Sequence, residues 1–145
     1  MQPFPHHYEV GASADAEGPV VLSHRGVASL ESLSPVEFGG PGGTWSPEAL
    51  LVAAVADCFI LTFRAVAKAS QLEWASLGVE AEGTLERRER VTAFTAFRLR
   101  ARLVVAAGVD ADAARAALER AEHGCLVSNS LKAPVELEPE IAFAG

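Results

Sequence analysis

The longest hydrophobic segment of the chain runs through residues 50–61, and its apolar side chains fall on every side of a helix rather than on one stripe. Ser46, Pro47 and Glu48 precede it. They favour a helix start, because serine caps free N–H groups, proline fits the first turn and glutamate is stabilised by the positive end of the helix dipole. The pattern predicts a helix that ends near residue 70. A helix apolar on all sides belongs inside a protein or between subunits.

The polar residues of this helix are aligned. Asp57, Arg64 and Lys68 are spaced by seven and then four positions, so they share one stripe of a 3.6-residue helix. This stripe is interpreted as the solvent-facing edge, along which Arg64 can pair with Asp57. Cys58 points about 100° away from it and is predicted to lie buried in the core.

The segments on both sides of the helix predict strands. Short apolar runs such as residues 19–22, separated by glycines, indicate brief strands in a meander before the glycine-rich residues 39–43. After the helix, residues 78–85 alternate faintly and residues 91–105 more clearly, and the charged residues 86–90 between them are typical of a solvated hairpin tip.

The C-terminal part predicts a second helix and a last strand. Residues 110–123 are rich in alanine, with Asp110 and Asp112 at the start and Gly124 as a helix stop. Residues 135–141 form an extended segment, which Pro139 makes an edge or a broken strand. The order of elements is that of an α+β protein. With no repeat or linker, residues 1–145 are predicted to form a single domain.

Composition narrows the class of partner. A chain of 145 residues, half of them apolar, can bury a core without disulfides or metals. Its 12 basic and 19 acidic residues give a net charge of −7, which disfavours nucleic acid and anionic membranes as partners. We find no signal-peptide pattern and no uninterrupted apolar run of about 18 residues. We therefore expect a cytoplasmic protein, whose thiols rest reduced.

Several familiar site types fit the sequence poorly. The glycines of residues 39–43 lack the lysine and hydroxyl residue of a phosphate-binding loop. His123 lies two residues from Cys125, but zinc requires four ligands and the chain has no paired metal-binding spacing, so we expect no bound metal or cofactor. A Cys–His hydrolase stays possible, although no base is placed against Cys58 by the sequence alone.

The two cysteines stand in different surroundings. Cys58 precedes bulky residues that can form the wall of an apolar pocket, whereas Cys125 follows a helix end, with Ser128 and Asn129 placed to orient it. Free cysteines are most often plain core residues. An apolar pocket raises the pKa of a thiol unless a cation or hydrogen-bond donors oppose it. A reactive Cys58 therefore needs a nearby positive group.

The chain resembles the OsmC/Ohr family of bacterial thiol peroxidases, which reduce organic hydroperoxides. The resemblance covers most of the chain and is carried by four segments in the family order: residues 37–43, 46–51, 57–59 and 124–131. It implies an α+β subunit with an OsmC-like fold, in which two chains interweave into a homodimer around long buried central helices. The active sites would then lie at the subunit interface.

By this resemblance, Cys58 is the peroxidatic nucleophile and Cys125 the resolving cysteine. The Cys58 thiolate would open the peroxide O–O bond and become a sulfenic acid. Condensation with Cys125 would form a disulfide that an external dithiol, such as a lipoylated protein, reduces. The apolar pocket favours alkyl or fatty-acyl hydroperoxides over hydrogen peroxide.

The sequence departs from the family at the group that supports the thiolate. Val36 occupies the position of an arginine that pairs with the glutamate at the helix start, here Glu48. Glu48 lies ten residues, about 15 Å, from Cys58 along one helix, so it can act only across a dimer or through a bend. Asp57 adds a negative charge where relatives have a small residue, which opposes thiolate formation if the two groups are close.

The sequence also differs from the family after the second cysteine, and other residues could replace the missing arginine. Leu126 replaces a proline that often follows the second cysteine. The missing cation could be supplied by one of three other residues, Arg25, Arg64 or His24. If none does, the alternative is a catalytically weak or inactive relative that binds a small apolar or thiol ligand or senses oxidants.

Overall fold

The computed structural model describes residues 1–145, and the chain divides into two compact units, residues 1–50 and 51–145. The N-terminal unit holds a three-stranded antiparallel meander, with strand order β1-β2-β3. Its elements are β1 (Gly11–Ser13), β2 (Val20–Ser23), β3 (Leu30–Ser32) and the 3-10 helix η1 (Val36–Phe38). The predicted meander of brief strands is therefore confirmed.

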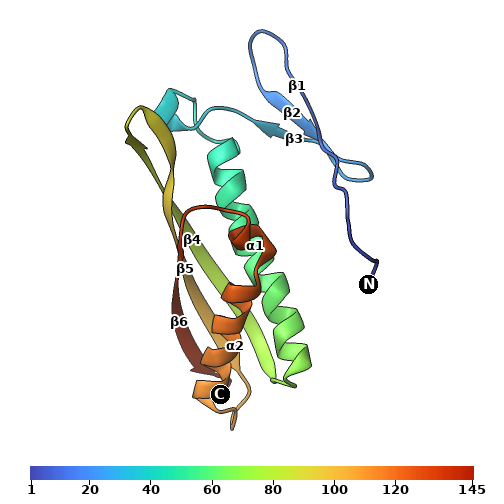
Figure 1. The fold of residues 1–145 in the computed structure, drawn as a ribbon, viewed down its shortest axis with the longest axis vertical. Coiled ribbons are helices and arrows are strands. Elements are labelled where there is room, and N and C mark those ends of the chain that lie inside the picture. The colour runs from blue at the N-terminus through green and yellow to red at the C-terminus, as the bar shows by residue number, and fades with distance from the viewer. The chain divides into compact units, whose positions relative to one another are not determined.

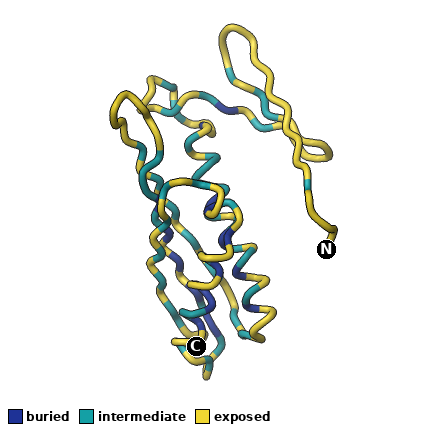
Figure 2. The backbone as a smooth tube through the Cα atoms, in the orientation of Figure 1, coloured by how far each residue is buried: buried dark blue, intermediate teal, exposed yellow.

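Helix α1 (Pro47–Ala69) forms where the sequence predicted it (Figure 1). The Ser46 hydroxyl accepts a hydrogen bond from the backbone N–H of Ala49 at 3.1 Å, which is the N-cap that the sequence indicated. The helix buries a single row of side chains, Val55, Phe59, Phe63 and Ala67, spaced four residues apart. Most of its other apolar residues are only partly covered in the single chain (Figure 2).

The C-terminal unit is built on a second three-stranded sheet. Its strands are β4 (Trp74–Arg88), β5 (Val91–Val105) and β6 (Val135–Phe143). The central strand β5 pairs antiparallel with β4 and parallel with β6. The predicted hairpin tip is confirmed, because Glu89 and Arg90 form the turn between β4 and β5, both with positive φ. β6 is an edge strand, as Pro139 predicted, and it is unbroken.

Helices α1 and α2 (Ala111–Gly124) cover one face of this sheet (Figure 1). The alternating residues of β5 from Phe97 to Val105 face them and are buried, whereas the arginines between them face away. Gly83 on β4 allows α1 to approach the sheet, because an added Cβ would lie 2.8 Å from the side chain of Val52. The core therefore lies between the sheet and the two helices.

The segment from β5 to β6 carries α2 and the short helix α3 (Leu126–Asn129). The side chain of Asp110 accepts a hydrogen bond from the N–H of Asp112 at 3.2 Å, which confirms the predicted helix start. The end differs from the prediction by one residue. Gly124 is the last helical residue, and Cys125 follows it in an extended conformation.

The burial of the two cysteines corrects the sequence prediction. Cys58 was expected to lie in the core, but it is only half-buried in the single chain, whereas Cys125 is fully buried. The reason is the narrow contact of α1: only the row through Phe59 reaches the core, and Cys58 lies beside that row. The stripe of Asp57, Arg64 and Lys68 is exposed, as predicted.

Helix α1 is also long and apolar enough to cross a membrane by length and composition. The charged stripe interrupts its apolar sequence, which is why no continuous run is visible in the primary structure. Core helices of water-soluble proteins have the same length and composition, so one such helix is weak support for a membrane span.

Candidate functional site

Cys58 lies at the middle of α1, where its sulfur faces a hydroxyl group one turn further along. The Thr62 hydroxyl donates a hydrogen bond to the Cys58 carbonyl oxygen at 2.7 Å, and its oxygen lies 3.9 Å from the Cys58 sulfur. The one donor of the Thr62 hydroxyl is thus used on the helix itself, whereas its oxygen can still accept a hydrogen bond from the Cys58 thiol. Thr62 was not among the predicted site residues, although its i, i+4 spacing from Cys58 is visible in the sequence.

Cys125 lies at the junction of α2 and α3 and has no exposed surface. Its backbone N–H donates to the Glu122 carbonyl at 3.3 Å, and its own carbonyl accepts from the N–H of Asn129 at 3.0 Å. The sulfur is thus held on a stretch of backbone that is fixed on both sides. The prediction that this cysteine lies at an element end is confirmed.

The fold brings the two cysteines together. An added Cβ at Gly124 would lie 3.5 Å from the side-chain methyl of Thr62, so the end of α2 packs against the turn of α1 that contains Cys58. Burial raises the pKa of the Cys125 thiol, and the neighbouring Cys58 thiol acts in the same direction. Cys125 therefore rests as a neutral thiol at neutral pH, near enough to Cys58 for the two thiols to influence each other.

Ser128 and Asn129 contact the Cys125 segment in different ways. The hydroxyl and the backbone N–H of Ser128 act against burial and lower the pKa of Cys125. The Asn129 side chain instead donates to the His123 carbonyl at 3.1 Å and so ties α3 to the end of α2. Asn129 thus contacts the backbone of this segment, whereas Ser128 acts on the Cys125 thiol.

No cation is bonded to the Cys58 thiol in this chain. Arg64 is exposed on the solvent-facing stripe, and no ion pair joins it to Asp57. Arg25 belongs to the N-terminal unit and is exposed, as is His24, whose ring nitrogen lies 2.8 Å from the Glu9 carbonyl.

The N-terminal unit contains a second feature of chemical interest at Glu48. One carboxylate oxygen of Glu48 is buried and has no hydrogen-bond partner. It borders a pocket of about 270 Å³, whose walls include Leu33, Pro35 and Phe38. Val36, the first residue of η1, is 63% exposed. Glu48 thus has an unpaired carboxylate oxygen, and its expected arginine partner is replaced by Val36.

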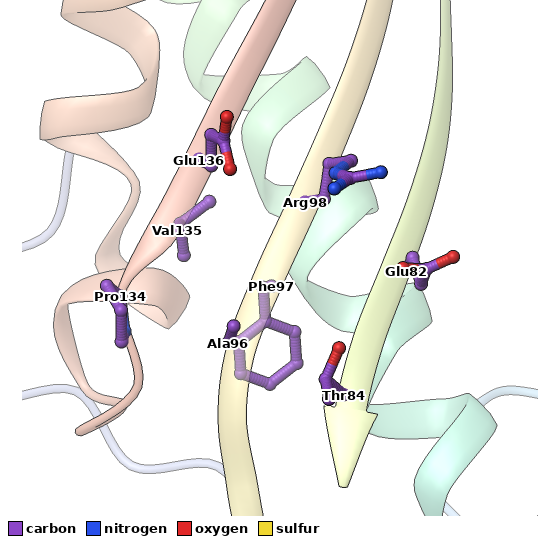
Figure 3. A pocket seen from close by; sticks show the side chains of 8 residues that line it. All are labelled: Glu82, Thr84, Ala96, Phe97, Arg98, Pro134, Val135 and Glu136. Atoms are coloured by element: carbon purple, nitrogen blue, oxygen red, sulfur yellow. The ribbon is translucent and has the colours of Figure 1, made fainter.

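The outer face of the β4-β5-β6 sheet has a shallow groove of about 280 Å³ near the start of β6 (Figure 3). The charged side chains around it are Glu82, Arg98 and Glu136 from three neighbouring strands. Arg98 also lies 3.5 Å from Glu138. The groove contains neither cysteine and no other nucleophile of comparable reactivity. It is best explained as part of a solvated ladder of charges across the sheet.

No group of three or more His, Cys, Asp or Glu side chains is arranged to hold a metal ion. His123, the histidine nearest to Cys125 in sequence, is exposed and lies 3.8 Å from the Glu122 carboxylate. The chemistry available at the site is therefore that of two neighbouring thiols with hydroxyl groups on either side.

Residues 40–140, more than half of the chain, match the family model described as OsmC-like protein. The chain belongs to the OsmC family. The family segments quoted from the sequence lie in or near this range and include both cysteines. The α+β fold with its two small sheets and helices agrees with solved OsmC-like structures.

The relatives cover the chain well. The uncharacterised protein YmaD of Bacillus subtilis is 31% identical over 109 residues, which are 73% of each chain. An OsmC-like protein of unknown function from Vibrio cholerae has a TM-score of 0.85 at 17% identity, over 94% of this chain and all of its own. An organic hydroperoxide resistance protein from Legionella pneumophila has a TM-score of 0.76 at 24% identity, over 97% of this chain and 99% of its own.

Proposed function

We propose that this OsmC family member is a thiol-dependent peroxidase that reduces organic hydroperoxides. The observation that carries the proposal is the placement of Cys58 and Cys125: two free thiols from distant segments lie close to each other, where the end of α2 packs against α1 in the C-terminal unit. Some structural neighbours are named organic hydroperoxide resistance proteins, which supports the same chemistry. The activity serves defence against oxidative stress in the cytoplasm.

The two thiols take different roles because their surroundings differ. Cys58 is partly exposed, so a peroxide can reach it, whereas Cys125 is fully buried and rests as a neutral thiol. The Cys58 thiolate attacks one peroxide oxygen, the O–O bond breaks, and the leaving alkoxide takes a proton to give an alcohol. Cys58 is left as a sulfenic acid.

The second step closes a disulfide. The Cys125 thiolate attacks the sulfur of oxidised Cys58, hydroxide leaves and takes a proton to become water, and the S–S bond forms. This step protects Cys58 from further oxidation. An external dithiol, such as a lipoylated protein, then reduces the disulfide and returns both thiols.

The uncovered surface of α1 supports a homodimer with an apolar active-site entrance. Leu61, three residues from Cys58, is 54% exposed in the single chain, and Leu126 beside Cys125 is 70% exposed. Exposed apolar side chains that lie together on one surface mark an interaction site. We assign this surface to the second copy of the chain and to the alkyl group of the substrate.

The direct test is peroxide consumption by the purified protein with a dithiol reductant. We expect tert-butyl and fatty-acid hydroperoxides to be consumed faster than hydrogen peroxide, because only the organic substrates gain from burial against apolar side chains. The measurement is the initial rate with each peroxide at equal concentration. Equal rates at the level of free dithiol would reject the proposal.

A second candidate function has its own observation, the combination of exposed Val36 and unpartnered Glu48. Without a cation at the thiol, the protein would be a weak peroxidase or an inactive one that binds a small apolar or thiol ligand or senses oxidants. Stoichiometric oxidation of Cys58 without turnover would favour this function over the first.

Substituting Val36→Arg tests how much the missing cation matters. The guanidinium is expected to pair with the buried Glu48 carboxylate. Because Glu48 is too far from Cys58 along one helix, the added charge is expected to act on Cys58 of the second copy in the proposed dimer, and to raise the rate of Cys58 oxidation by up to about tenfold. The rate is measured by stopped-flow with tert-butyl hydroperoxide. Val27→Arg, which changes another exposed valine of the same unit, is the matched control and should leave the rate unchanged.

A further inference from the structure

Ser128 is a buried polar residue with an unused hydroxyl. The residue is 8% exposed, and its hydroxyl oxygen is buried without a hydrogen bond of ordinary geometry. Its neighbour Ser130 behaves differently, because the Ser130 hydroxyl donates to the Leu126 carbonyl at 2.7 Å. Buried hydroxyl groups are nearly always paired, since an unpaired one costs stability. The Ser128 hydroxyl is therefore a candidate for a hydrogen bond that forms only during the reaction.

The group next to this hydroxyl is the sulfur of Cys125. Ser128 lies three residues after Cys125 on α3, and the chain between them is fixed by the hydrogen bonds of the short helix. Both the hydroxyl and the backbone N–H of Ser128 favour the ionised form of Cys125, while burial opposes it. A neutral thiol is a weak acceptor, whereas a thiolate accepts such hydrogen bonds strongly.

We propose that Ser128 is a positioning residue whose hydroxyl donates a hydrogen bond to the Cys125 sulfur whenever that sulfur carries negative charge. This inference rests on the proposed function, because charge appears on Cys125 only in a thiol–disulfide cycle. It assigns to Ser128 a part in both the closing and the opening of the disulfide. The peroxide step at Cys58 does not involve it.

The burial difference between the cysteines sets the direction in which the disulfide opens. Cys125 has no exposed surface, so an external thiolate attacks the accessible Cys58 sulfur. The bond to Cys125 breaks, its electron pair moves to the Cys125 sulfur, and Ser128 stabilises the thiolate formed. The second thiol of the reductant then attacks the reductant sulfur bound to Cys58. Cys58 leaves as a thiolate and the reductant becomes a cyclic disulfide.

The test is the variant Ser128→Ala, followed through one turnover. Without the hydroxyl, the pKa of Cys125 should rise further, so less thiolate is present at neutral pH and the sulfenic acid at Cys58 should persist longer. We expect disulfide formation to slow by about tenfold at neutral pH, with its pH profile displaced upward by about one unit. The preceding reaction of Cys58 with peroxide should keep its rate.

Two variants separate this role from a structural one. Ser128→Thr keeps a hydroxyl and should restore the wild-type pH profile. Ser130→Ala removes a hydroxyl that serves only the α3 backbone and should leave the profile unchanged. Sulfenic acid is followed by dimedone trapping and disulfide formation by mass spectrometry.

The outcomes distinguish the inference from the function on which it rests. An unchanged pH profile in Ser128→Ala, in a wild-type background that forms the disulfide, would overturn the inference and leave the proposed function intact. Equal slowing in Ser128→Ala and Ser130→Ala with no displacement of the profile would also overturn it. If wild-type protein forms no sulfenic acid with peroxide, the proposed function itself fails.

Discussion

Replacing Cys58 by serine is expected to remove the reduction of organic hydroperoxides, with a loss of at least about 1000-fold in rate. The serine hydroxyl is close in size to the thiol but is a far weaker nucleophile at neutral pH, and it cannot form a sulfenic acid or a disulfide. The partly exposed site of Cys58 on α1 tolerates this change, so the fold should be preserved. The measurement is the initial rate with tert-butyl hydroperoxide and a dithiol.

Cys125→Ser is the matched control for that loss. Its Cys58 should still react once with peroxide at the wild-type rate, but the sulfenic acid should accumulate because no second thiol can condense with it. A Cys58→Ser protein that retains turnover, or a Cys125→Ser protein that turns over normally, would contradict the proposed division of roles.

Phe63→Ala is expected to produce the largest loss of stability, about 3–5 kcal/mol in the free energy of unfolding. Phe63 is fully buried on the core-facing row of α1, and its ring meets that of Trp74 edge to face with centroids 5.2 Å apart. Truncation removes this aromatic contact and leaves a cavity between α1 and β4. Urea denaturation at one fixed protein concentration measures the change, since the proposed dimer would unfold in a concentration-dependent way.

Val91→Ala is the control for this prediction. Val91 is 64% exposed at the hairpin tip, so its truncation should change stability by no more than about 0.5 kcal/mol. A loss below about 1 kcal/mol for Phe63→Ala would show that the row through Phe63 is not the main contact between α1 and the sheet.

Much of the fold could be predicted from local patterns. Ser46 and Asp110 mark the starts of the two long helices because their side chains cap free N–H groups, a local interaction that the sequence displays. The alternation in residues 91–105 likewise reflects one buried and one solvated face of β5. The parallel pairing of β6 with β5 was not predicted, because it depends on how the α2 segment crosses the sheet.

The candidate site could be predicted only in part. The family segments pointed to Cys58 and Cys125, but the prediction that Cys58 is buried was wrong for the single chain. When a helix is apolar on all sides, its sequence does not reveal which row of side chains is buried within the single chain and which rows stay partly exposed. The contact of Thr62 with Gly124 and the unpaired hydroxyl of Ser128 depend on how α2 and α3 pack, which no spacing rule predicts.

The most direct test of the account is mass spectrometry of the reduced protein after one equivalent of an organic hydroperoxide. We predict that the chain loses the two thiol hydrogens and that digestion releases the Cys58 and Cys125 peptides joined by a disulfide. A protein that stays fully reduced, or in which Cys58 is oxidised to sulfinic acid while Cys125 remains a free thiol, would contradict the claim that these two residues form one redox pair.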